Sequence, residues 1–108
     1  MAVVNRFDVY LINLDSSPSE DAKNTRPGVV LSPDEVNRNL DHVIIAPIAS
    51  TNAKYPTRVA VEFLNSERFV IIDQIRTVDK KRLVKKIGEI SEQAQGPILD
   101  RLGELFAK

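Results

Sequence analysis

The feature that most constrains this chain is a succession of short apolar runs separated by polar segments rich in turn formers. The runs have the length of strands and carry mostly β-branched and aromatic residues, a composition typical of sheets. The run 42–48 is apolar on both faces and should be a central strand, with Pro47 at an edge or a bulge. We predict strands over residues 9–12, 28–31, 42–48, 58–63, 69–78 and 86–90.

Helical signals are fewer and gather near the C-terminus. Asp79 is placed to cap a short basic helix over residues 80–85. Residues 34–37 fit either a turn of helix or a polar crossing. An apolar stripe at helical spacing predicts a final helix, which starts after Ser91 with a kink at Pro97 or starts at Pro97 itself. The stripe consists of Ile98, Leu99, Leu102, Leu105 and Phe106.

This order predicts a mainly β (α+β) fold: a small, strongly bent antiparallel sheet or partly open barrel. A short helix follows the strands and a C-terminal helix closes the fold. A chain of 108 residues without a linker or an internal repeat is short for two cores, so we expect a single domain over 1–108. The absence of cysteine excludes a disulfide framework and a thiol nucleophile, and the single histidine excludes a two-histidine acid–base pair.

The charges balance, with 15 Lys plus Arg against 15 Asp plus Glu. Neutrality argues against a protein that binds nucleic acid through bulk positive charge, but it permits a local basic groove. No segment has the composition of a secretory signal or the length of a membrane span, so we expect a cytoplasmic protein without a membrane partner.

Arg26 is the most informative polar residue, because it ends a long polar loop, residues 15–27, immediately before a buried strand. A guanidinium held by a rigid element offers a planar fork of donors that suits a phosphate. An ion pair with Asp21 or Asp73 would explain the residue equally well.

Other polar residues give weaker signals. The basic run 79–86 fits a phosphate-binding patch, although a solvated face is the commoner explanation. Glu20 and Asp21 can supply a base or a metal ligand, but such a loop pair is more often plain surface. His42 begins a buried strand and is more often structural there. Three hydroxyl residues follow strand 42–48: Ser50, Thr51 and Thr57. A role in capping the loop and a role in catalysis explain them equally well.

Several segments together resemble one known family, the MazF/PemK/Kid toxins (mRNA interferases) of type II toxin-antitoxin systems. The matching segments are 6–10, 13–15, 25–33, 46–48, 55–59 and 73–80, and they run nearly end to end. The resemblance implies one toxin domain over 1–108, an SH3-like barrel that forms a homodimer. It implies a metal-independent endoribonuclease without a cofactor, which cuts single-stranded mRNA to 2′,3′-cyclic phosphate and 5′-OH ends, inhibits translation and growth, and is neutralised by a cognate MazE-like antitoxin.

The resemblance also implies roles for individual residues. Arg26 matches the arginine that stabilises the phosphate and donates a proton, and Asp21 or Glu20 would orient it or act as the base. Asp73 matches an acidic residue that is catalytic in some members. The implied catalytic set is Arg26, Asp21, Ser50 and Asp73, and the implied RNA-binding set is Glu20, Thr25, Tyr55, Gln74 and Arg76.

The sequence departs from the family pattern at the residue that follows the Ala-Pro-apolar stretch. The family usually has a catalytic threonine there, and this chain has Ala49, so Ser50 or Thr51 would have to supply the hydroxyl. Phe7 and Ser19 stand where the family has glycine. The departure at Ala49 admits an alternative, a catalytically weak or inactive member that binds antitoxin or RNA. A CcdB-like gyrase poison fits less well, because this chain has no tryptophan.

Overall fold

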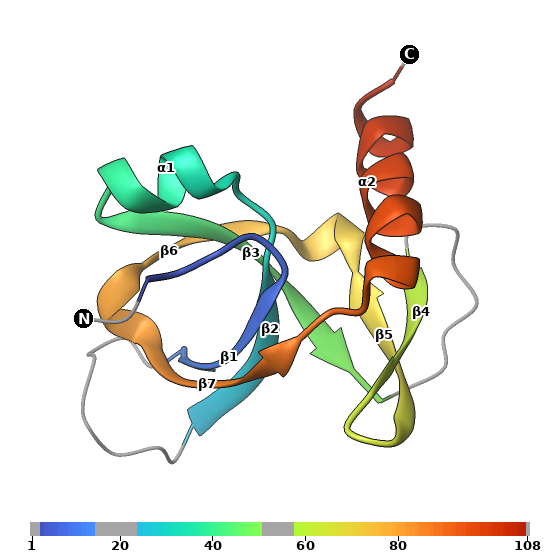
Figure 1. Cartoon of the computed structure of the whole chain (residues 1–108), viewed down its shortest axis with the longest axis horizontal. Helices are drawn as coiled ribbons and strands as arrows, with labels where there is room; N and C mark the ends of the chain where they lie inside the picture. Colours follow the sequence, from blue (N-terminus) through green and yellow to red (C-terminus); the bar gives the residue numbers. More distant parts are fainter. Residues whose placement is uncertain (1–2, 15–23, 51–57, 108) are drawn as a thin grey trace.

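Seven short strands curl into one antiparallel sheet with a long C-terminal helix beside it (Figure 1). The computed structural model describes residues 3–14, 24–50 and 58–107. The strands are β1 (Asp8–Asn13), β2 (Thr25–Val30), β3 (His42–Ala49), β4 (Arg58–Phe63), β5 (Ser66–Ile71), β6 (Arg76–Asp79) and β7 (Leu83–Glu89). The helical elements are α1 (Asp34–Asn39), the 3₁₀ turns η2 (Ile72–Gln74) and η3 (Lys80–Arg82), and α2 (Glu92–Phe106). The predicted mainly β fold with a C-terminal helix is confirmed.

The sheet has the strand order β4-β5-β3-β2-β1-β7, and β6 also pairs with β3. The first half of β3 pairs with β6 and its last two residues pair with β5, so both partners lie along one edge of β3 (Figure 1). From β6 the chain passes through η3 into β7, which pairs with β1 at the other end of the curled sheet. This crossing turns the sheet into a small barrel.

The prediction of one strand over 69–78 is wrong, because η2 interrupts it. The β3 ladder with β6 ends at Ile45, the ladder with β5 begins at Ile48, and η2 lies between them. The carbonyl of Ile44 accepts a hydrogen bond from Leu31, on the β2 side. Since successive residues of a strand bond toward alternate edges, the nitrogen of Pro47 faces the η2 edge, where it has no hydrogen to donate. A fully hydrogen-bonded ladder is therefore impossible at that point.

The predicted basic helix over 80–85 is also wrong. Only Lys80–Arg82 form a turn, and from Leu83 the chain is strand, paired with β1. Asp79 precedes this turn but forms no side-chain capping bond. The short helix of the fold therefore lies earlier in the chain, at α1, where the sequence allowed either a helical turn or a polar crossing.

The final helix begins after Ser91, the first of the two predicted starts, and Pro97 lies inside it. Ile98 is completely buried, and α2 packs against β4 and η2 through this side of the helix. The C-terminal end of α2 extends beyond the sheet, and 72% of the Phe106 surface is exposed (Figure 1). No helix in the described ranges is long and apolar enough to cross a membrane.

Most of β1 and the second halves of β2 and β3 are buried on both faces, which explains their nearly continuous apolar runs, whereas Ile44 in the first half of β3 is 39% exposed. Alternate residues enter two separate clusters. One cluster lies inside the barrel and includes Tyr10, Ile12 and Ile45, whereas the other lies toward α2 and includes Val9 and Ile98.

Phe7 adopts a backbone conformation that suits glycine better, with φ of 72°. This left-handed region is costly for a side chain that has a Cβ. The Phe7 ring offsets that cost by filling the cluster beside α2, where only 7% of the residue is exposed, and the Arg6 guanidinium lies 5.8 Å from its centroid. The departure from the family glycine is thus accommodated by packing.

A buried polar pair fastens α1 to β3. The Ser32 hydroxyl donates to Asn37 Oδ1 over 2.5 Å and accepts from the Ile44 N–H over 3.1 Å, and Asn37 Nδ2 donates to the Ser32 carbonyl over 2.9 Å. Both side chains are 2% exposed. Each buried polar group of this pair therefore has a partner.

Replacing Asn37 by alanine should lower the free energy of unfolding by about 2–3 kcal/mol, because it leaves the buried Ser32 carbonyl without its side-chain donor and opens a cavity. Urea denaturation measures this change. Asn39→Ala is the matched control, since Asn39 is exposed and bonds only within α1, to the Glu35 carbonyl. Equal losses in the two variants would contradict the structural role of the pair.

Candidate functional site

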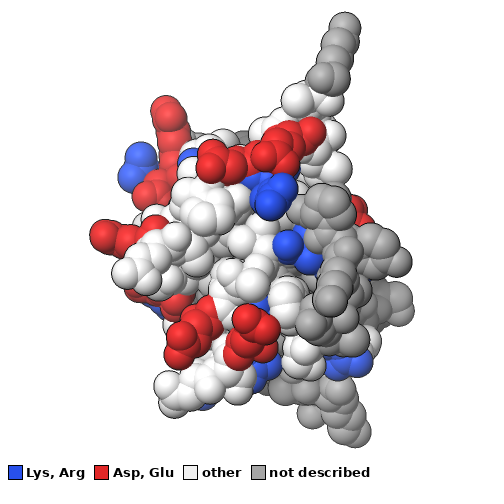
Figure 2. Space-filling model, turned by 90° about the vertical axis from the view of Figure 1, so that its right-hand side faces the viewer, with Lys and Arg blue, Asp and Glu red and all other residues white. Residues whose placement is uncertain are grey.

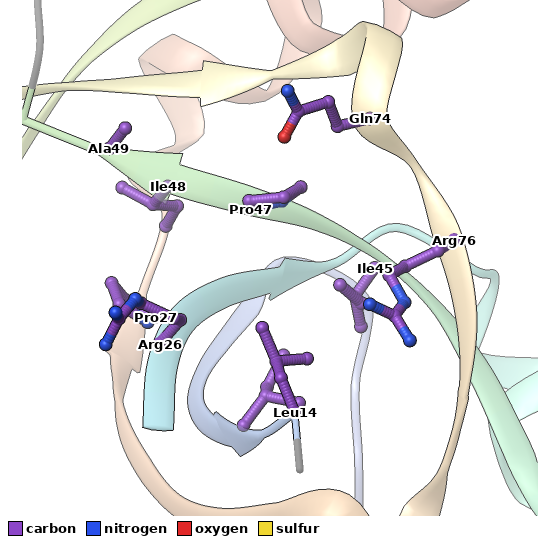
Figure 3. Close-up of a pocket in the computed structure, with 10 residues that line it drawn as sticks. Leu14, Arg26, Pro27, Ile45, Pro47, Ile48, Ala49, Gln74 and Arg76 are labelled. Atoms are coloured by element: carbon purple, nitrogen blue, oxygen red, sulfur yellow. The ribbon is translucent and has the colours of Figure 1, made fainter. Parts of the chain in front are cut away.

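A pocket of about 460 Å³ opens at the mouth of the barrel, where β1, β2, β3, η2 and β6 meet. We call it the arginine pocket, because its polar lining consists of Arg26, Gln74 and Arg76 (Figure 3). The rest of the described lining is apolar: Ile12, Leu14, Pro27, Ile45, Pro47, Ile48 and Ala49.

Arg26 lies near the start of β2, directly opposite Ile12 of β1. Its backbone is held in the ladder while its side chain is exposed, and Nη1 donates to the Thr25 carbonyl over 3.1 Å. Within the described ranges Arg26 forms no ion pair. Arg26 therefore does not form the ion pair with Asp73 that would have given it a structural role. The other possible partner, Asp21, lies outside the described residues.

Gln74 and Arg76 reach the pocket because η2 breaks the strand. Gln74 ends the 3₁₀ turn, and Arg76 is the first residue of β6, opposite Ile45. In Figure 3 Arg26 and Arg76 lie on opposite sides of the pocket, and the Gln74 amide points toward β3. The two guanidinium groups thus approach one hollow from two different strands.

Ala49 ends β3 and lines the pocket (Figure 3). It shares the period-two face of β3 with Ile45 and Pro47, which line the same hollow. Ser50 follows it, is exposed and is not among the lining residues. Successive strand residues point to opposite faces, so a hydroxyl at position 49 would enter the pocket directly.

The remaining predicted residues are placed as follows. Thr25 is half-buried and pairs with Asn13 across β1 and β2. Asp73 is exposed in η2 and is not part of the described pocket lining. Glu20, Asp21, Thr51 and Tyr55 lie outside the described residues. The roles assigned to all of these residues stay predictions.

The charge and shape of the arginine pocket suit an anion attached to a flat, partly apolar group. Two guanidinium groups and one carboxamide face the hollow, and its described lining contains no carboxylate. Guanidinium groups bind phosphate oxygens with charge-assisted hydrogen bonds, and an apolar wall can receive a nucleobase. A phosphate with its attached nucleoside has this chemistry.

The residues that the sequence analysis missed are the apolar ones, Leu14 and Ile45 above all. Leu14 stands directly before the polar loop 15–27 and Ile45 lies within the apolar run 42–48, and neither position by itself carries a functional signal. The period-two spacing of Ile45, Pro47 and Ala49 was a usable signal, because it places all three residues on one face of a strand.

Nothing in the described part of the chain suggests a metal centre, since no group of three His, Cys, Asp or Glu side chains gathers there. His42 is exposed at the start of β3, opposite Asp79 of β6, and does not line the arginine pocket.

Comparison with known proteins places these features in context. The model of a family described as "PemK-like, MazF-like toxin of type II toxin-antitoxin system" matches residues 5–106. The chain is 35% identical over 96 residues to Endoribonuclease MazF of Staphylococcus epidermidis, an alignment that covers 83% of this chain and 80% of the relative.

Solved structures agree on the fold. A MazE-MazF structure from Deinococcus radiodurans superposes with a TM-score of 0.81 at 22% identity, covering 99% of this chain and 98% of that chain. An endoribonuclease from a mycobacterial species superposes with a TM-score of 0.80 at 24% identity, covering 96% and 91% of the two chains.

Proposed function

Because the chain belongs to the PemK-like, MazF-like toxins of type II toxin-antitoxin systems, a family with endoribonuclease activity, we propose that it cuts single-stranded mRNA in the arginine pocket. The cleavage is sequence-specific and metal-independent, and it inhibits translation and growth. The observation that carries the proposal is the pair of guanidinium groups, Arg26 and Arg76, on opposite sides of one apolar hollow.

The proposed reaction uses the RNA itself as the nucleophile. The ribose 2′-oxygen attacks the adjacent phosphorus, the bond from phosphorus to the 5′-oxygen breaks, and the products are a 2′,3′-cyclic phosphate and a 5′-OH. A base must take the proton of the 2′-OH, a donor must protonate the leaving 5′-oxygen, and positive charge must stabilise the pentavalent phosphate. None of these steps calls for a metal or another cofactor.

Arg26 is the proposed stabiliser of the pentavalent phosphate and donor to the 5′-oxygen, since its guanidinium is exposed in the pocket without a described acidic partner. Asp21 is the proposed base, with Asp73 as a second acidic group and Ser50 as the hydroxyl. Glu20, Thr25, Tyr55, Gln74 and Arg76 are proposed to bind the RNA. Gln74 and Arg76 are supported by their place in the pocket lining.

The proposed protein partner is a cognate MazE-like antitoxin. The Deinococcus radiodurans relative was solved as a MazE-MazF complex, and the cationic arginine pocket would attract an acidic antitoxin tail. We also propose that the toxin acts as a homodimer. Membership of this toxin family favours RNA cleavage over gyrase poisoning.

The purified protein should cleave a long single-stranded RNA in the presence of EDTA. Arg26→Ala should lower kcat by about 10²–10³-fold, because it removes the charge that stabilises the pentavalent phosphate. Gel analysis with 5′-end and 3′-end labelling measures both the rate and the chemistry of the ends.

Arg38→Ala is the control for this experiment, since Arg38 is exposed on α1 and does not line the arginine pocket. It should cleave at the wild-type rate. Absence of cleavage by the wild type, or equal rates for the wild type and Arg26→Ala, would exclude the proposed function.

Substitutions at positions 49 and 50 test which residue supplies the catalytic hydroxyl. If Ser50 already supplies it, Ala49→Thr should change kcat by less than about tenfold, whereas Ser50→Ala should lower kcat by about 10²-fold. Ala60→Thr, at an exposed alanine on β4, controls for the general effect of a new hydroxyl. A gain of more than about 10²-fold in Ala49→Thr alone would favour the alternative, a catalytically weak member that chiefly binds RNA or antitoxin.

A further inference from the structure

A second hollow, of about 240 Å³, lies on the other side of β1 from β2, between β1, η3 and β7. We call it the lysine pocket, because its cationic lining is Lys80, Lys85 and Lys86. Its apolar wall includes Tyr10, Leu83 and Val84. The described lining of this pocket contains no carboxylate. The basic run that the sequence left open as a patch or a solvated face is therefore folded around a hollow.

The three lysines differ in how far their charge is compensated. Lys86 Nζ lies 3.3 Å from Asp8 Oδ1 and 3.0 Å from Glu89 Oε1, and these two hydrogen bonds raise the pKa of Lys86, the one to Glu89 more. Lys80 and Lys85 form no ion pair with any residue that the structure describes. Two ammonium groups at the lysine pocket therefore remain for an external anion.

The buried carboxylate of Asp8 explains why Lys86 is held in place. Asp8 is 2% exposed, and its Oδ2 accepts the N–H of Asn5 over 2.8 Å. Lys86 is the cation that pairs with this buried carboxylate. Lys86 is thus a structural part of the pocket wall, whereas Lys80 and Lys85 are the residues suited to a ligand.

The lysine pocket adjoins the arginine pocket. Ile12, which lines the arginine pocket, is the cross-strand neighbour of Leu83, which lines the lysine pocket. Paired strands lie about 4.8 Å apart, so the two pockets have neighbouring residues of β1 and β7 in their walls. Arg82 lies next to this junction, where its Nη1 donates to the Asn13 carbonyl over 3.2 Å. The shared wall makes the two pockets neighbours, as one nucleic acid strand that occupies both would require.

The neutral net charge conceals a separation of charge. Residues 76–86 contain six Lys or Arg and one acidic residue, Asp79. Asp79 does not line the lysine pocket, but Lys80 also lines a neighbouring hollow together with Asp41, Asp79 and Lys81. The face shown in Figure 2 has acidic side chains over α2 and over the β4–β5 hairpin. Basic side chains lie between these acidic ones on that face, whereas the excess of cations in β6, η3 and β7 attracts a polyanion to that segment.

We propose that the lysine pocket binds a backbone phosphate of the RNA outside the arginine pocket, through Lys80 and Lys85, and so raises affinity without taking part in cleavage. This proposal rests on the proposed function. RNA is favoured over an acidic peptide because the two pockets are adjacent and both cationic, and one continuous polyphosphate chain can occupy both. Lysine ammonium groups bind phosphates as point charges, so this contact is independent of sequence.

The double variant Lys80→Gln/Lys85→Gln tests the proposal with a single-stranded RNA of about 20 nucleotides, longer than one binding site. KM should rise about tenfold and kcat should stay unchanged, because the lost contact lies away from the reacting phosphate. The Kd for single-stranded DNA of the same sequence, which lacks the attacking 2′-OH, should rise by the same factor. The slope of log Kd against log salt should decrease by about 0.7, the value for one lost phosphate contact on a single strand.

The matched control is Gln93→Glu/Arg101→Gln on α2, which lowers the net charge by the same amount on the acidic side. Both positions are exposed. This variant should keep the KM and the salt dependence of the wild type. Lys85→Gln alone changes an exposed strand position and should raise KM and Kd by part of the amount seen in the double variant. This single variant replaces the double variant if the latter fails to fold.

The proposal would be overturned by an unchanged KM and Kd in the lysine variant, or by a fall in its kcat at constant KM. It would also be overturned if the control variant on α2 raised KM and Kd as much as the lysine variant does. A variant that loses binding of a polyglutamate peptide but keeps wild-type nucleic acid affinity would show a peptide surface instead, and would also overturn it. If the wild type cleaves no RNA, the proposed function fails, whereas the lysine pocket is still judged by the Kd for DNA.

Discussion

The architecture of the site depends on the missing N–H of Pro47. The nitrogen of Pro47 faces the edge of β3 that β5 and β6 share, so the ladder cannot continue across it, and η2 forms opposite. The turn places Gln74 and then Arg76 at the mouth of the barrel, opposite Arg26. It also gives α2 a surface to pack against. One absent hydrogen-bond donor thus connects the irregularity of the sheet with the position of the polar lining.

A second constraint is that most of β1 and the second halves of β2 and β3 are buried on both faces. The clusters inside the barrel and beneath α2 take alternate residues of β1, β2 and β3, which leaves no room for polar side chains in the middle of these strands. The cations that line the two pockets therefore lie near strand starts, in a turn or on the outermost strand: Arg26 near the start of β2, Arg76 at the start of β6, Lys80 in η3, and Lys85 and Lys86 in β7. A chain with no net charge can in this way have two pockets whose described charged lining is entirely cationic.

Much of the fold was predictable from the sequence, since β1, β3, β4 and α2 follow directly from apolar spacing. The errors over 69–78 and 80–85 have one cause. In both segments the conformation is decided by a partner strand distant in sequence, β3 for η2 and β1 for β7, which local propensity does not register. Within the site, Arg26 was predictable as an accessible guanidinium at the end of a loop. The meeting of Arg26, Gln74 and Arg76 in one pocket was implied only by family resemblance, because spacing alone cannot place residues from different strands together.

The protein thus has two neighbouring cationic pockets, of which the arginine pocket is proposed to hold the phosphate that is cut. A crystal structure of the protein with an uncleavable single-stranded oligodeoxynucleotide tests this claim most directly. The account predicts a backbone phosphate between Arg26 and Arg76, with guanidinium nitrogen to phosphate oxygen distances of about 2.7–2.9 Å and an adjoining base against the apolar wall. A strand bound elsewhere on the molecule, with the arginine pocket free of phosphate, would contradict it.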